Sequence, residues 1–105
     1  MQKYDKLVRD KIPLIITKNG EKPIIKILND KDFKHELEKK LYEEYQEVIN
    51  SEGTERLEEL ADMLEVIKYL AKIEKSDLNE ILKIAEKKNE KKGSFNNKIF
   101  LEEVD

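Results

Sequence analysis

Two long stretches of this chain carry apolar residues at every third or fourth position, which is the spacing of a helix with one buried face. The first runs from residue 32 to about residue 51, and the second from about residue 54 to residue 73. Only Ser51, Glu52, Gly53 and Thr54 separate them, and so short a connection favours two antiparallel neighbours, with Thr54 capping the second helix. The sequence therefore predicts a helical hairpin as the centre of the fold.

Shorter segments flank this hairpin. A short helix is expected near Pro13 and stops at Asn19-Gly20, and a further helix is expected from about residue 77 to Gly93, where glycine suits a helix end. Residues 23–28 and 98–103 are short apolar runs, and the first is rich in β-branched side chains. We expect them to pair as a minor two-stranded β element beside an otherwise all-α, antiparallel helical bundle.

A chain of 105 residues with 38% hydrophobic residues is expected to form one domain, residues 1–105, with a thin core. A second copy is expected to complete that core, as a homodimer or a homotetramer. The near balance of 21 basic and 24 acidic residues does not indicate nucleic-acid binding. There is no cysteine, no run long enough for a membrane span and no signal peptide, so a cytoplasmic protein is expected.

Paired carboxylates mark the hairpin as a candidate metal site. Glu44 and Glu47 lie three residues apart in the first helix, and Glu59 and Asp62 lie three apart in the second, each pair at the edge of its apolar stripe. Antiparallel packing would set the two pairs opposite each other. Four carboxylates require a cation among them, and their hard oxygen atoms suit Mg²⁺, with Mn²⁺ as an alternative.

Composition alone offers another interpretation. In a chain with 24 acidic residues, pairs spaced by three arise readily and usually lie on solvated helix faces. The single histidine, His35, does not form a Glu-x-x-His pair, so a ferritin-like di-iron site is not predicted. A helical interaction or metal-binding module without enzymatic activity is therefore an alternative from the residues themselves.

The acidic pattern resembles that of the MazG-type all-α nucleoside triphosphate pyrophosphohydrolases, a superfamily that includes phosphoribosyl-ATP pyrophosphohydrolase and dimeric dUTPases. Here the pattern reads Glu43-Glu44-x-x-Glu47 followed by Glu59-x-x-Asp62. Residues 4–13, YDKLVRDKIP, are similar to the amino terminus of a small single-domain MazG-like subfamily. Residues 92–95 and 99–102 are similar to its carboxyl end.

The resemblance implies metal-dependent hydrolysis of a nucleoside triphosphate to a monophosphate and pyrophosphate, with a house-cleaning role. It implies Glu44, Glu47, Glu59 and Asp62 as metal ligands and catalytic residues, with Glu43 orienting water or supporting a ligand. Basic and amide side chains are expected to bind the substrate phosphates, Arg9 before the others because its planar fork matches phosphate. These candidates are Arg9, Lys6, Lys88, Asn89 and Lys92.

Two features limit the likeness. The stretch between the acidic motifs is short for the superfamily, which argues against a dUTPase with its larger insertions. Lys92 stands where an arginine is frequent. Phosphoribosyl-ATP is the alternative substrate, and the base-specific residues are not identifiable from the sequence.

Overall fold

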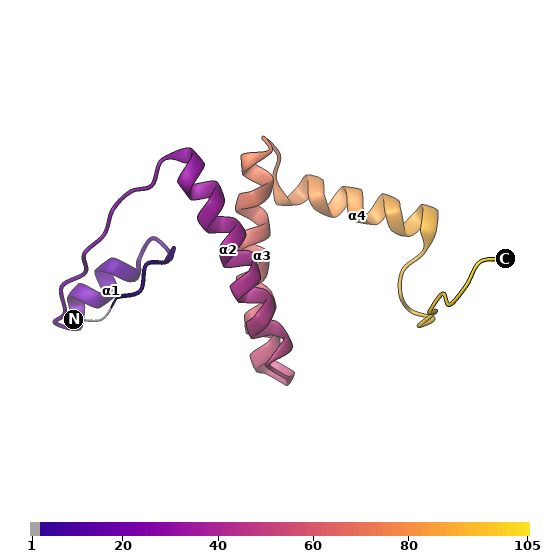
Figure 1. Cartoon of the computed structure of the whole chain (residues 1–105), viewed down its shortest axis with the longest axis horizontal. Helices are drawn as coiled ribbons and strands as arrows, with labels where there is room; N and C mark the ends of the chain where they lie inside the picture. Colours follow the sequence, from indigo (N-terminus) through magenta and orange to yellow (C-terminus); the bar gives the residue numbers. More distant parts are fainter. Residues whose placement is uncertain (1–2) are drawn as a thin grey trace.

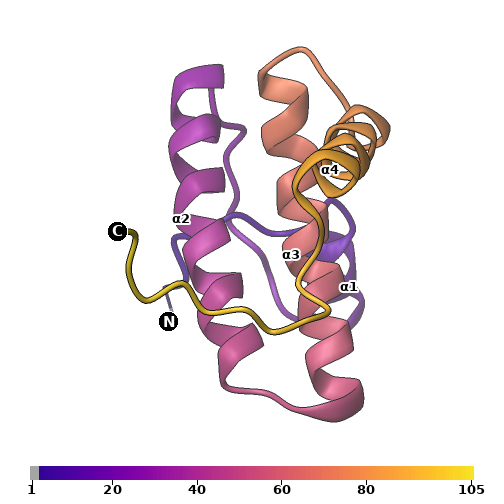
Figure 2. The same ribbon diagram turned by 90° about the vertical axis from the view of Figure 1, so that its right-hand side faces the viewer.

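The computed structural model describes residues 3–105 and contains four helices in that range (Figure 1). Helix α1 spans Ile12–Lys18, α2 Asp30–Ile49, α3 Gly53–Ile73 and α4 Leu78–Lys92. The expected all-α class is confirmed. Figures 1 and 2 show α2 and α3 lying side by side, and Figure 1 shows α1 and α4 on opposite sides of the pair. In the described part of the chain, no helix is both long and apolar enough to cross a bilayer.

Two of the helices begin with a side-chain cap that the sequence supplies. The side chains of Asn29 and Asp77 each accept a hydrogen bond of 2.8 Å from the backbone amide three residues further on, at the starts of α2 and α4. Such caps satisfy amides that have no partner within the helix. Helix α3 differs from the expectation, because it begins at Gly53 after Glu52 and not behind a Thr54 cap.

The tight turn between α2 and α3 is held by side chains. Ser51 is buried in this turn, and its hydroxyl donates to the carbonyl oxygen of Val48 at 3.1 Å. The Arg56 Nε atom donates to the carbonyls of Val48 and Ser51 at 3.1 and 2.8 Å. These bonds satisfy the Val48 carbonyl in the last turn of α2, which otherwise has no partner within the helix, and the Ser51 carbonyl in the loop. They fix the antiparallel course of the hairpin.

The core between α2 and α3 is thin. Its buried apolar side chains are Leu37 from α2 and Val66 and Ala71 from α3. The stripe expected to face α2 instead stays partly outside, since Leu60 and Leu64 are 43% and 44% exposed. Together with neighbouring side chains they line an apolar groove along α3, made by Leu57, Leu60, Ala61, Met63, Leu64 and Ile67. One hairpin thus leaves part of its apolar surface uncovered.

The dimensions of the chain also show that a single copy is not compact. Its radius of gyration is 18.1 Å, whereas a compact domain of this length has about 13 Å. Its accessible surface is 10089 Å², whereas a folded monomer of this mass exposes about 6,200 Å². A single copy therefore exposes far more surface than a self-sufficient domain.

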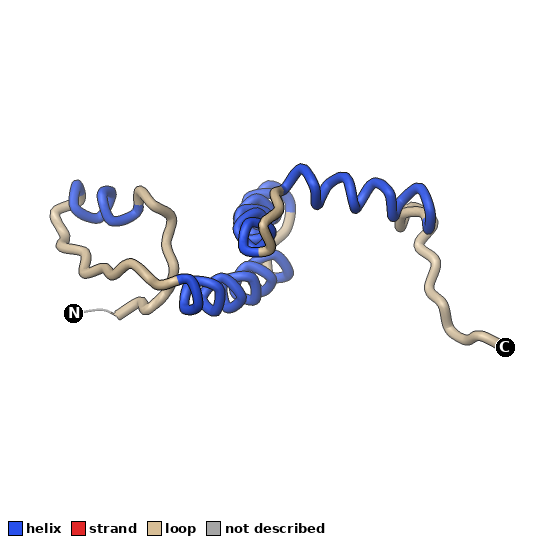
Figure 3. Tube along the Cα trace, turned by 90° about the horizontal axis from the view of Figure 1, so that it is seen from above, coloured by secondary structure: helices blue, strands red, loops and turns tan. Residues whose placement is uncertain are grey.

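The expected two-stranded β element is not formed within residues 3–105. Residues 23–28 and 98–103 have neither helix nor strand, and they lie toward opposite ends of the molecule in Figure 1. Helix α4 packs only on α3 among the described helices and ends at Gly93, whose φ of 84° turns the chain away. Helix α4 thereby carries residues 98–103 away from residues 23–28, as Figure 3 also shows.

Candidate metal centre

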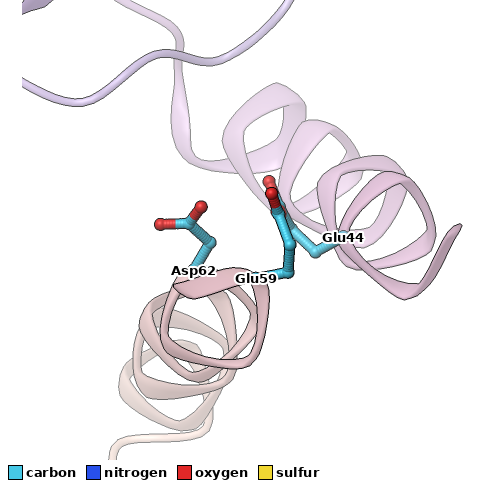
Figure 4. A group of neighbouring side chains, drawn as sticks. All are labelled: Glu44, Glu59 and Asp62. Carbon is cyan, nitrogen blue, oxygen red and sulfur yellow. The ribbon is translucent and has the colours of Figure 1, made fainter. Parts of the chain in front are cut away.

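Three of the four predicted metal ligands come together between α2 and α3. Glu44 projects from α2, and Glu59 and Asp62 project from neighbouring turns of α3 (Figure 4). One carboxylate oxygen from each lies within 4.8 Å of the other two. The close packing of the two antiparallel helices produces this convergence, since it places residue 44 opposite residues 59 and 62. We call these three side chains the acidic group.

Glu47, the fourth predicted ligand, lies outside the acidic group. Its side chain is exposed, although it is one turn from Glu44 on α2. Its negative charge still raises the pKa of both Glu44 and Glu59, so it adds to the anionic field of the group.

Two carboxyl groups of the acidic group have raised pKa values. Glu44 is only 8% exposed, and burial is the main reason that its pKa is raised above the ordinary value. Repulsion from Asp62 adds to the increase in the pKa of Glu44. The pKa of Glu59 is raised as well, first by desolvation and then by the charges of Glu47 and Asp62. The raised pKa values mean that ionisation of these two carboxyl groups is less favourable in the folded chain than in the unfolded one.

Two basic side chains already contact the group. The Arg9 guanidinium forms an ion pair of 2.8 Å with Asp62, which joins the amino-terminal segment to α3. Lys40 lies 3.6 Å from Glu43 and 3.7 Å from Glu44, and its charge partly offsets the effect of burial on Glu44. Lys40 was not among the predicted site residues. Its spacing of three and four residues before the two glutamates is a helical ion-pair signal that could have identified it.

The other predicted phosphate ligands do not meet the acidic group in one chain. Lys6 is exposed, and its ammonium lies 5.8 Å from the ring centre of Tyr4. The remaining three, Lys88, Asn89 and Lys92, are exposed in the last turns of α4. Since α4 leads away from the hairpin in Figures 1 and 3, these residues project to another region of the molecule.

The donor set fits a hard divalent cation. All three side chains offer carboxylate oxygen, the atom that Mg²⁺ and Mn²⁺ prefer. In octahedral coordination, neighbouring oxygen ligands of Mg²⁺ stand about 3 Å apart and opposite ones about 4.2 Å apart, whereas the three oxygen atoms lie within 4.8 Å of one another. The side chains would have to move inward to coordinate one ion, and water or phosphate oxygen atoms would complete the shell.

Comparison of the chain with protein-family models, curated proteins and solved structures gave no match. The likeness of its acidic pattern to that of the MazG-type hydrolases therefore stays a prediction from the sequence. The geometry of the acidic group stands independently of that likeness.

Proposed function

We propose that this chain is a divalent-metal-dependent nucleoside triphosphate pyrophosphohydrolase that uses Mg²⁺ or Mn²⁺. The observation that carries the proposal is the meeting of Glu44, Glu59 and Asp62 within 4.8 Å, with one of them buried and two with raised pKa values. Clustered carboxylates with perturbed pKa values are common at binding and catalytic sites. The resemblance of the acidic pattern supplies the reaction.

Glu44, Glu59 and Asp62 would hold the ion, and Glu47 would join them after its side chain rotates. A bound divalent ion would screen the carboxylates from the triphosphate and stabilise the negative charge that develops on the leaving group. Without that positive charge, the acidic group would repel a polyanionic substrate. The same carboxylates therefore make nucleotide binding conditional on metal.

Arg9 is placed to change partners when metal binds. Both members of its ion pair with Asp62 are well exposed, so the pair contributes little to stability and is readily exchanged. If Asp62 coordinated a cation, the Arg9 guanidinium would be free to contact another anion beside the site. Its planar donors would suit a phosphate group. Lys6 lies in the same amino-terminal segment and would add positive charge there.

The reaction is hydrolysis at the α-phosphorus. The oxygen of a water molecule bonds to that phosphorus, and the bond to the oxygen bridging the α- and β-phosphates breaks. Pyrophosphate leaves with the bonding electrons, and the water proton passes to a basic group of the site or to solvent. Glu43 lies beside the acidic group on α2 and is proposed to orient the water, with Lys40 holding its carboxylate at 3.6 Å.

A homo-oligomer, dimeric or tetrameric, is part of the proposal. The exposed groove along α3 and the excess surface of the single chain support it. Lys88, Asn89 and Lys92 project away from the acidic group of their own chain. If they bind substrate phosphate, they must therefore do so at the site of a neighbouring copy.

A panel of canonical and modified triphosphates, with phosphoribosyl-ATP included, tests the activity. Pyrophosphate release with Mg²⁺ or Mn²⁺ is expected from at least one substrate. It should fall at least 100-fold in Glu59→Gln and Asp62→Asn. Glu58→Gln is the matched control, because Glu58 is exposed on α3 beside Glu59 and outside the acidic group.

Two results would contradict this assignment. The first is the absence of pyrophosphate from every substrate, and the second is undiminished release by both site variants. Metal-dependent stabilisation without turnover would instead identify a helical metal-binding module, in which the acidic group serves structure or regulation.

A further inference from the structure

Two apolar segments of the described chain lie exposed on opposite sides of the helical hairpin. Residues 24–28 precede α2, and residues 99–104 follow α4. Ile24 and Ile27 are 84% and 90% exposed, and Phe100 is 86% exposed. Both segments are rich in the β-branched or aromatic residues that favour strands. Such side chains are normally buried, so their exposure marks surfaces that are covered in the working protein.

The two segments cannot cover each other within one chain in this arrangement. The molecule is 61 Å long, and Figure 1 places the amino-terminal region at one end and the carboxyl terminus at the other. After Gly93, a turn closed by the hydrogen bond from the Lys98 amide to the Phe95 carbonyl directs residues 99–105 outward. A segment held away from the rest of its own chain in this way is suited to exchange between identical copies.

We infer that residues 99–104 of one copy add as an antiparallel strand to residues 24–28 of a second copy. The charges of the two segments are complementary: Lys22 and Lys26 lie in or beside the first, and Glu102 and Glu103 in the second. A register with Lys26 opposite Glu102 forms a cross-strand ion pair. On the same face, that register also sets apolar residues opposite each other, Ile24 with Val104 and Leu28 with Phe100.

The surface area of the chain supports a second copy as the occupant. Each copy exposes roughly 3,900 Å² more than a folded monomer of its mass, whereas a stable interface needs only about 800 Å² from each partner. Reciprocal exchange about a two-fold axis forms two of these ribbons. A two-stranded ribbon is marginal alone, so the exchange is expected to act together with burial of the α3 groove. This assembly is independent of the hydrolytic activity proposed above.

The absence of cysteine from the chain allows a direct cross-linking test. Ile24→Cys protein carrying a size tag is mixed with untagged Val104→Cys protein, and the mixture is oxidised and separated under denaturing conditions. Only a bond between copies can join a tagged chain to an untagged one, and paired strands hold the two Cα atoms at disulfide distance. The expected product is the mixed disulfide, formed at least tenfold faster than with Lys91→Cys, an exposed α4 control.

Two cross-linking results would overturn the inference. One is a mixed disulfide that forms no faster with Val104→Cys than with the Lys91→Cys control. The other is preferential linkage of Val104→Cys to Leu64→Cys, which would place the carboxyl-terminal segment in the α3 groove.

Charge reversal provides a second test with the folded chain of 105 residues. Lys26 and Glu102 are both exposed, so their substitution should leave the helices intact, as circular dichroism would verify. Lys26→Glu or Glu102→Lys alone should weaken self-association in sedimentation experiments about tenfold, because each dimer contains two such pairs. The double variant should recover most of the loss. Equal self-association in all four proteins would contradict the pairing.

Discussion

Replacement of Glu44 by glutamine is expected to stabilise the metal-free protein. Glu44 is the most buried member of the acidic group, and its pKa is raised mainly by burial and further by the charge of Asp62. A raised pKa means that the folded state favours the neutral carboxyl group. Glutamine has nearly the same shape and carries no charge, so Glu44→Gln reproduces that neutral form at every pH.

The size of the effect follows from the geometry. Two unit charges 4.8 Å apart, the limit found in the acidic group, repel by about 3.5 kcal/mol at an effective dielectric constant of about 20. Solvent screening at a site open to water reduces such interactions to about 1 kcal/mol, and the attraction of Lys40 at 3.7 Å offsets part of the repulsion. We therefore expect a gain of about 1 kcal/mol in the free energy of unfolding, which raises Tm by about 4 °C.

Magnesium should reverse this ranking. The wild-type protein is expected to gain about 2.7 kcal/mol when free Mg²⁺ is at about 100 times the Kd, whereas Glu44→Gln has lost a ligand and should gain little. Thermal unfolding followed by circular dichroism, with EDTA or with Mg²⁺ and at one protein concentration, measures both quantities. A glutamine variant that is less stable in EDTA, or that gains as much as wild type from Mg²⁺, would refute the reasoning.

Three further predictions concern pH, Arg9 and the hairpin turn. Because the pKa values of Glu44 and Glu59 are raised in the folded state, the metal-free protein loses stability as pH rises above their ordinary value of 4.5. The increase in Tm caused by Mg²⁺ should therefore grow between pH 5 and pH 7.5. An increase that stays constant over this range would argue against Mg²⁺ binding at the acidic group. Arg9→Gln should raise KM for the triphosphate about tenfold, because a charged phosphate contact is lost. It should leave Tm within about 2 °C of the wild-type value, since the ion pair with Asp62 is exposed. An unchanged KM in steady-state kinetics would show that Arg9 does not contact the substrate. Arg56→Ala should lower the free energy of unfolding by about 1–3 kcal/mol in urea denaturation, because the carbonyl of buried Ser51 loses its donor, whereas the Val48 carbonyl keeps the Ser51 hydroxyl. Glu55→Ala, at an exposed neighbour, should cost less than about 0.5 kcal/mol.

The helices were predictable because their signals are local. The apolar spacing of the two long stretches and the stop at Gly93 each involve residues within one or two turns. The meeting of Glu44 with Glu59 and Asp62 was predictable for a related reason, since a short turn between two helices leaves few ways to align them. Arg56 was missed because a basic residue after a turn has no distinctive spacing with the carbonyls that it contacts.

Predictions that depend on contacts distant in sequence fared less well. The expected pairing of residues 23–28 with residues 98–103 assumed that both segments reach the same region, but α4 carries the second segment away. The apolar stripe of α3 was expected to face α2, yet Leu60 and Leu64 line an outward groove. Periodicity identifies an apolar stripe but does not identify the surface that covers it.

Phosphorus NMR of a triphosphate incubated with the protein tests the central claim most directly, because it identifies which phosphoanhydride bond is cleaved. The proposed mechanism predicts equal amounts of nucleoside monophosphate and pyrophosphate in the presence of Mg²⁺, and neither product in the presence of EDTA. Orthophosphate with nucleoside diphosphate, or turnover that continues in EDTA, would contradict it.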